Sequence, residues 1–286
     1  MHLVVALFAL AAGAFAQRGL GGGGSGFATD FVGFGVPYGG CGVPQSWLAD
    51  DNGSPMPFVA LNTFANTAGS AQGLFQDGGN CGRWIRITAC ENCVHGSDNQ
   101  WEACIVGSTN GLANYSPDSL TGTVLYGYVA DSCGDFNLWC RLTPFHVDVD
   151  QAYLQPYISA GLWNNRLVDW EFIDGAPPGW TFSQPAKFGW AQGAYLPYYP
   201  SLIVYDTVNG ISGVSAKNAA GQFVAATKNG PLGNMYVLPA GAVTGGSVVV
   251  QVSDALGASY GTFQVDFPCT GTCATPTKAV ASRLTT

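Results

Sequence analysis

Short runs of strand-forming residues, separated by clusters of glycine, asparagine, aspartate and serine, recur along almost the whole chain. Typical runs are RWIRITA and TVLYGYVA in the first half, and SLIVYDTV and GSVVVQVSD in the second. Runs of this length bounded by turn residues are typical of β-strands. They do not alternate with helical segments, apart from one expected helix after Asp150. The sequence therefore predicts an all-β protein.

The segment DGAPPGW, residues 174–180, interrupts this pattern. Its two adjacent prolines can neither continue a strand ladder nor enter a helix interior. We therefore expect a first β domain over residues 27–174 and a linker over 175–180. Beyond the linker, strands at short, regular spacing predict a β-sandwich over residues 181–268. The tail, residues 269–286, is expected to lack regular structure.

The chain begins with a short apolar run that ends in Ala-Phe-Ala, which fits a signal peptide over residues 1–16. A glycine-rich flexible leader is expected over residues 17–26. The apolar run is too short to span a bilayer. Nine cysteines fit an oxidising compartment, and their odd number leaves at least one without a partner in the chain. We expect a secreted, extracellular or cell-wall protein.

The charge of the chain excludes some classes of partner. Eighteen acidic residues against ten basic ones give a net charge of −8. Binding to nucleic acid or to anionic lipid depends on clustered lysine and arginine, so neither nucleic acid nor a membrane is expected as a partner. The sixteen phenylalanines, twelve tyrosines and eight tryptophans offer flat apolar surfaces instead, although most should pack in the core. A neutral partner fits this chain better.

The cysteine pattern gives little support for a metal site. CENC, residues 90–93, resembles half of a zinc site, but no second pair of cysteine or histidine residues with ligand spacing follows it. Disulfides are the commoner use of cysteines in secreted proteins. We therefore expect no metal and no cofactor, and leave the disulfide pairing open.

The run FHVDVDQAY, residues 145–153, places His146, Asp148 and Asp150 in strict alternation. In a strand these three side chains share one face, while the apolar residues between them pack behind. Asp150 precedes the expected helix and should cap its first turn. Asp148 is an ordinary surface residue if that face is solvated. If the face lines a groove, burial would raise its pKa and make it a proton donor.

Several ordered motifs resemble the expansins. DSCGDFNLWCRLTPFHVDV is similar to the expansin signature, in which Asp-x-Cys is followed by Trp-Cys and then His-x-Asp. Upstream, FATDFVGFG, GGCG, VALNT and NCG are similar to earlier landmarks of the family. The likeness extends over most of residues 27–174. A looser one continues through YLPYYPSLIVYD, GQFVAATKNG and VVVQVSDALGA. The resemblance implies a six-stranded double-psi β-barrel followed by an immunoglobulin-like β-sandwich.

The same resemblance implies the residues of a site in the barrel. Asp148 matches the acid of His-x-Asp, Asp131 the acid of Asp-x-Cys, and Thr29 the threonine of the opening strand. These three would line an open groove, with His146 beside them. In the related family 45 endoglucanases, which are inverting hydrolases, the catalytic base falls on the position of Gly33. Since inversion needs two carboxylates, and Asp30 should face away from the groove, the comparison predicts no hydrolysis.

The second domain would bind sugar on exposed aromatic rings. Tyr198 and Tyr199 match the paired aromatics of the family's binding strip, and Tyr236 is a third candidate. Adjacent strand residues face opposite ways, so both tyrosines can share one surface only if Pro197 and Pro200 keep the segment out of the ladder. The alternative is that one of the pair is buried.

These resemblances lead to three functional hypotheses. The first is a secreted, monomeric, expansin-like protein that binds cellulose, xyloglucan or a related β-glucan and loosens cell walls without hydrolysis. The second is a family 45-like endo-β-1,4-glucanase whose base has moved to another position, for which Asp131 is a candidate. The third is a barwin-like or lectin-like carbohydrate-binding module without effect on walls.

Overall fold

The computed structural model describes residues 23–34, 37–63, 74–94, 115–134, 139–140, 145–163, 165–196, 198–230, 232–244 and 246–284. The predicted signal peptide lies outside these residues. Within them strands dominate, and the longest helix is α2 (Gln151–Ser159). None of the described helices is long and apolar enough to cross a membrane.

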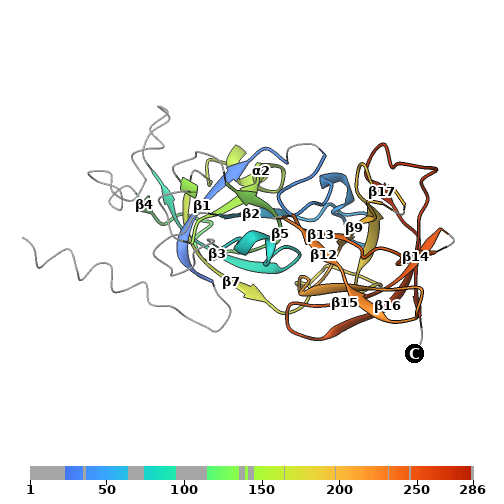
Figure 1. Cartoon of the computed structure of the whole chain (residues 1–286). Coiled ribbons are helices and arrows are strands. Elements are labelled where there is room, and N and C mark those ends of the chain that lie inside the picture. The colour runs from blue at the N-terminus through green and yellow to red at the C-terminus, as the bar shows by residue number, and fades with distance from the viewer. Residues whose placement is uncertain are drawn as a thin grey trace, which may run out of the picture.

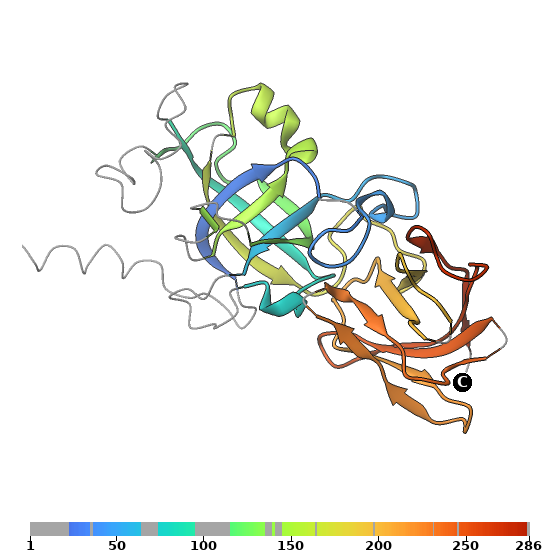
Figure 2. The ribbon, with the colours of Figure 1, turned by 45° about the horizontal axis from the view of Figure 1, so that its top comes forward.

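The first half forms one seven-stranded sheet in the order β4-β3-β5-β2-β6-β1-β7. Because β3 also pairs with β7, six of these strands close into a ring (Figures 1 and 2). The pairs β1–β6 and β2–β5 are parallel, and the others are antiparallel. The strands are β1 (Gly24–Phe31), β2 (Phe58–Asn62), β3 (Trp84–Cys93), β4 (Tyr115–Ser116), β5 (Val124–Cys133), β6 (Val147–Asp150) and β7 (Arg166–Ile173).

Alternation along the strands builds the interior of this barrel. In β7, for example, Val168, Trp170 and Phe172 are buried, while the residues between them are more exposed. They join one apolar cluster with side chains from β2, β3, β5 and β6. Helix α2 lies beside β1 and β6 on the barrel, away from the second half of the chain (Figure 2).

Strand β1 corrects the expected extent of the flexible leader. It begins at Gly24, and residues 24–28 pair with β7. A Cβ atom on Gly26 would lie 2.3 Å from the carbonyl oxygen of Phe145, and one on Gly24 would lie 2.8 Å from its ring. The glycines at the end of the predicted leader therefore allow close packing in a strand.

The second half contains two further sheets, of order β11-β10-β15-β16-β18 and β12-β13-β9-β8-β17, with β14 paired to β15. Both contribute to one core, in which the rings of Phe188 and Phe263 lie 4.9 Å apart. The predicted class, a six-stranded barrel followed by a β-sandwich, is confirmed. The strands are β8 (Lys187–Trp190), β9 (Ser201–Tyr205), β10 (Gly213–Lys217), β11 (Phe223–Ala225), β12 (Thr227–Asn229), β13 (Leu232–Val237), β14 (Val243–Thr244), β15 (Ser247–Ser253), β16 (Ser259–Asp266), β17 (Thr277–Lys278) and β18 (Ala281–Leu284).

The tail contains regular structure, although the sequence predicted none. Strand β17 pairs with β8 in one sheet, and β18 pairs with β16 in the other. A disulfide joins Cys269 and Cys273 just before these strands. An uncovered sheet edge presents unpaired backbone groups, and the tail satisfies such groups on both sheets.

The barrel and the sandwich share a third apolar cluster. Trp47, Trp84 and Tyr128 of the barrel pack in it with Tyr205 and Met235 of the sandwich. β7 ends at residue 173 and β8 begins at 187, so the boundary predicted at residues 174–180 falls between the two sheet systems.

Candidate functional site

The barrel strands align the predicted acids in one row across four neighbouring strands. Asp148 on β6 pairs with Thr29 on β1 and with Ala60 on β2. Ala60 in turn pairs with Asp131 on β5. Directly paired residues share a face of a sheet, so Asp131, Ala60, Asp148 and Thr29 point to the same side. We call these four residues the acid row.

Asp131 joins the acid row because of a β-bulge. Val59 pairs with Val129, whereas the next residue, Ala60, pairs with Asp131, so Ala130 is an extra residue in β5. In a regular strand Asp131 would face the same way as Val129, which is in the barrel core. The extra residue turns the carboxylate to the other face, as bulges commonly re-aim a side chain.

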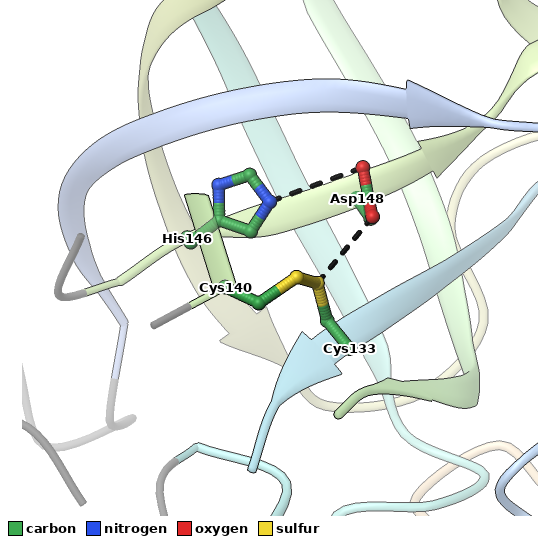
Figure 3. A group of neighbouring side chains, drawn as sticks. All are labelled: Cys133, Cys140, His146 and Asp148. Carbon is green, nitrogen blue, oxygen red and sulfur yellow. Dashed lines mark hydrogen bonds and ion pairs between the residues drawn. A yellow bond between two sulfur atoms is a disulfide. The ribbon is translucent and has the colours of Figure 1, made fainter. Parts of the chain in front are cut away.

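Asp148 is buried in a polar cluster (Figure 3). The hydroxyl of Thr29 donates a hydrogen bond to its Oδ1. Since that hydroxyl has one proton, the interaction between Thr29 Oγ1 and His146 Nε2, at 3.1 Å, needs an Nε2–H donor. His146 Nε2 also lies 3.8 Å from Asp148 Oδ1. Histidine, threonine and aspartate thus form a continuous polar chain, in agreement with their predicted proximity.

A disulfide completes the surroundings of Asp148. Cys133 bonds to Cys140, and the Sγ atom of Cys133 lies 3.4 Å from Asp148 Oδ2. A disulfide sulfur has no proton to donate, so this is a close contact rather than a hydrogen bond. The ring of Trp139 stacks on that of His146, with centroids 6.2 Å apart. The two oxygens of Asp148 therefore meet different partners, a hydroxyl at one and sulfur at the other.

Asp131 is fixed by backbone amides at the other end of the acid row. The amide groups of Gly40 and Ser132 both donate to its Oδ1, the latter at 2.8 Å. Burial raises the pKa of Asp131 despite these hydrogen bonds, and the negative charge of Asp148 adds to the rise. The side chain is oriented rigidly, with Oδ1 occupied by both amides.

The position that the resemblance assigns to the base, Gly33, has a left-handed backbone. Gly33 has φ +64°, and a Cβ there would lie 2.8 Å from Gln45 Oε1. A side chain there would therefore crowd Gln45. Asp30 pairs with Val149, one step away from the acid row, and accepts a hydrogen bond from Gln151 Nε2 at 2.8 Å. It therefore faces away from the row, as alternation predicts.

Asp150 caps helix α2, as the sequence predicts. Its carboxylate accepts a hydrogen bond from the backbone amide of Ala152 at 3.2 Å. The polar face of β6 is therefore buried over its whole length, with capping at one end and the cluster of His146 and Asp148 at the other.

The two predicted tyrosines are both at the surface. Tyr198 is 80% exposed and Tyr199 is 39% exposed, so the alternative in which one of them is buried is wrong. They lie in a turn closed by two backbone hydrogen bonds between Tyr195 and Tyr199. Pro197 lies outside the described residues. The ring of Tyr195, 40% exposed, lies within 22° of parallel to that of Tyr198, with centroids 5.6 Å apart. Sequence reasoning missed Tyr195, which we group with Tyr198 and Tyr199 as the tyrosine turn.

The prediction that Tyr236 is a third sugar-binding ring is wrong. It is 3% exposed and belongs to the core between the two sandwich sheets. Burial raises the pKa of its hydroxyl. A ring enclosed in the core cannot stack on a sugar, so Tyr236 is a packing residue.

A loop of the barrel contacts both the acid row and the sandwich. Gly40 of this loop donates to Asp131, and the hydroxyl of Tyr38 accepts a hydrogen bond from the amide of Gln192 in the sandwich. Burial raises the pKa of Tyr38, and Tyr199 contributes to the rise. The loop thus links Asp131 of the acid row to the sandwich at Gln192, just before the tyrosine turn in the sequence.

This closed barrel followed by a β-sandwich is similar in fold to solved structures of an expansin. The structure of the apo expansin of Clavibacter michiganensis matches 89% of this chain and 94% of its own, with a TM-score of 0.54 and 15% sequence identity. A mutant of that expansin in complex with cellohexaose matches the same shares, with a TM-score of 0.53 and 13% identity. No family model and no curated protein matches the sequence. The chain thus has the expansin fold.

Proposed function

We propose that the protein is secreted and binds chains of cellulose or a related β-glucan, such as xyloglucan, along its acid row and tyrosine turn. Its action would be to loosen the contacts between wall polymers without cutting them, as a monomer. The observation that carries the proposal is that one chain presents both the acid row on the barrel and the exposed rings of the tyrosine turn on the sandwich. The complex of a structurally similar expansin with cellohexaose supports a glucan ligand.

The acid row supports a role in binding rather than cleavage. Position 33 has no carboxylate, and Asp30 faces the other way. Asp148 then remains as an acid that can hydrogen-bond or protonate a sugar oxygen, without a base at the expected position to activate water.

One observation favours hydrolysis as a second candidate function. Asp131 and Asp148 lie two strands apart in the acid row, which places their Cα atoms roughly 9–10 Å apart in a regular sheet. Inverting glycosidases have carboxyl groups about 6.5–9.5 Å apart. Asp131 would then be the base.

Replacing Asp148 by asparagine is expected to abolish the mechanical creep of a wall strip, because the amide cannot protonate a sugar oxygen. Binding to cellulose should change less than about twofold if the tyrosine turn supplies most of the affinity. Creep and cellulose pull-down would be measured in parallel. Asp30→Asn changes a neighbouring acid on the other face and is the matched control. It should cause as much creep of the wall strip as the unmodified protein does.

Reducing sugar released from amorphous cellulose separates the hypotheses. Release that is lost in both Asp148→Asn and Asp131→Asn would establish the hydrolase and reject the proposal. Binding without creep and without sugar release would instead select a carbohydrate-binding module.

Removing the stacked rings is expected to weaken cellulose binding. Each exposed ring contributes about 1 kcal/mol to stacking, so the double variant Tyr195→Ala and Tyr198→Ala should bind roughly 20- to 30-fold more weakly. Pull-down isotherms on crystalline cellulose would measure this. Phe223→Ala removes a partly exposed ring on the other sandwich sheet and should leave binding unchanged. Equal partitioning of the double variant and the control would exclude the tyrosine turn.

A further inference from the structure

Four potential metal ligands meet beside the acid row (Figure 3). Donor atoms of Cys133, Cys140, His146 and Asp148 all lie within 4.8 Å of one another, and all four residues are buried. They come from the end of β5, the helical residues 139–140, and β6 with the residue just before it. Two sulfurs, an imidazole and a carboxylate form a set of four ligands that zinc binds in a tetrahedron.

The disulfide decides whether this set can bind a metal. The thiolate is the ligand that zinc binds, and a sulfur in a disulfide is not a thiolate. With the Cys133–Cys140 bond intact, only the imidazole and the carboxylate remain as ligands. With the bond reduced, both sulfurs become available in the same place.

We propose that this cluster is a redox-controlled zinc site, closed as a disulfide and able to bind Zn²⁺ when reduced. A dithiol reductant supplies two electrons and two protons. The S–S bond breaks, two thiols form, and the dithiol itself becomes a disulfide. Zn²⁺ then binds both sulfurs as thiolates and displaces their two protons to solvent.

The backbone geometry suits such a site. The Cα atoms of Cys133 and Cys140 are 5.6 Å apart. Two Zn–S bonds of about 2.3 Å at a tetrahedral angle place the sulfurs about 3.8 Å apart, which this Cα separation allows. Both β5 and β6 are paired to β2, so the sheet holds Cys133 close to Asp148. The two sulfur ligands are soft, which also favours a thiophilic ion such as zinc over magnesium or calcium.

The hydrogen bonds around Asp148 and His146 indicate which of their atoms would bind the metal. Thr29 donates to Oδ1 of Asp148, which leaves Oδ2, the oxygen beside Cys133, for the metal. A hydroxyl that holds the second carboxylate oxygen is a usual support for a metal ligand. His146 would bind through Nε2, which faces Asp148 (Figure 3), with its proton moved to Nδ1, and would give up its interaction with Thr29.

The experiment measures metal binding directly, with Co²⁺ as a spectroscopic probe and Zn²⁺ as its competitor. Protein reduced with a phosphine under anaerobic conditions should bind one Co²⁺ per chain and show thiolate-to-cobalt charge transfer. Zn²⁺ should remove this absorption stoichiometrically. Oxidised protein, and reduced Cys133→Ser with Cys140→Ser, should show none. Absence of the band in reduced protein that keeps its circular dichroism spectrum would overturn the proposal, as would its presence in oxidised protein.

Further variants separate this site from the other cysteines. Cys90→Ser, and the pair Cys269→Ser with Cys273→Ser, remove thiols elsewhere and should retain the band. Asp148→Asn keeps the cysteine pair and the size of the side chain, and should weaken Co²⁺ binding at least tenfold. A band that follows Cys90 or the Cys269 pair instead would place the metal elsewhere and reject this site.

Zinc at this site would also occupy the acid that the proposed function uses. This consequence, unlike metal binding, rests on that proposed function: reduced, zinc-loaded protein should lose creep and regain it on chelation and oxidation. If creep is absent in every form while the cobalt spectrum is as expected, the proposed function fails and the metal site stands.

Discussion

Replacing Arg166 by methionine is expected to lower the free energy of unfolding by about 3–5 kcal/mol, the usual cost of breaking a buried ion pair from one side. The Arg166 side chain is fully buried. Its guanidinium holds both oxygens of Asp118, at 2.7 and 2.9 Å, and the carbonyl groups of Leu162 and Cys90. Methionine fills much of the volume but removes the guanidinium's hydrogen bonds to all of these acceptors and leaves the Asp118 carboxylate without its opposite charge. Urea unfolding at neutral pH would measure the loss.

Arg86→Met is the matched control on the same barrel. Arg86 pairs with Glu171 at 3.0 Å, but the two side chains are 44% and 51% exposed. Such a surface pair contributes about 0–1 kcal/mol. If Arg166→Met costs no more than Arg86→Met, the buried pair has no special role. The double variant Arg166→Met with Asp118→Asn should cost less than the sum of the single changes, because the two residues share one interaction.

Replacing Asp206 by asparagine is expected to change how stability depends on pH. Burial raises the pKa of Asp206 to about 6, because lost hydration outweighs the attraction of Lys187, whose Nζ lies 3.0 Å away. The pKa in the unfolded chain is about 3.9. The folded protein therefore binds this proton more tightly, and stability from Asp206 is present below about pH 4 and lost as the pH rises through about 6. Between pH 4 and pH 7, the stability of Asp206→Asn should improve relative to the unmodified protein by about 2 kcal/mol.

Asparagine suits this test because Asp206 has φ +54°, a left-handed conformation that asparagine tolerates. Urea unfolding at several pH values would give the difference curve. Asp51→Asn is the control of opposite sign. Although burial alone would raise its pKa, hydrogen bonds from Ser183 and the charge of Lys187 lower the pKa of Asp51. Asp51 thus adds stability above its unfolded pKa that is lost as the pH falls. Curves that are flat for both variants would contradict the pKa assignments.

Regular alternation made much of the site predictable from the sequence. Strand β6 is short and regular, so the common face of His146 and Asp148, and the cap at Asp150, follow from a period of two. Asp30 could be placed on the opposite face for the same reason. The fold class followed from strand-like runs and turn residues along the whole chain.

Features that depend on tertiary contacts could not be predicted from the sequence. Composition could not show that Gly24 and Gly26 are packed against Phe145, or that the tail adds a strand to each sandwich sheet. Tyr236 lies on a strand whose sequence does not reveal which face is interior. The spacing Cys-x6-Cys-x5-His-x-Asp was visible, but which cysteines pair cannot be deduced from sequence.

The extra residue at Ala130 has a consequence for reading other chains of this fold. A relative with an aspartate at the same position of its sequence, but with no β-bulge in β5, would direct that carboxylate into the apolar interior. Whether two acids can act on one sugar thus depends on counting residues within a strand, and a gap of one in an alignment can separate members with paired acids from members without them.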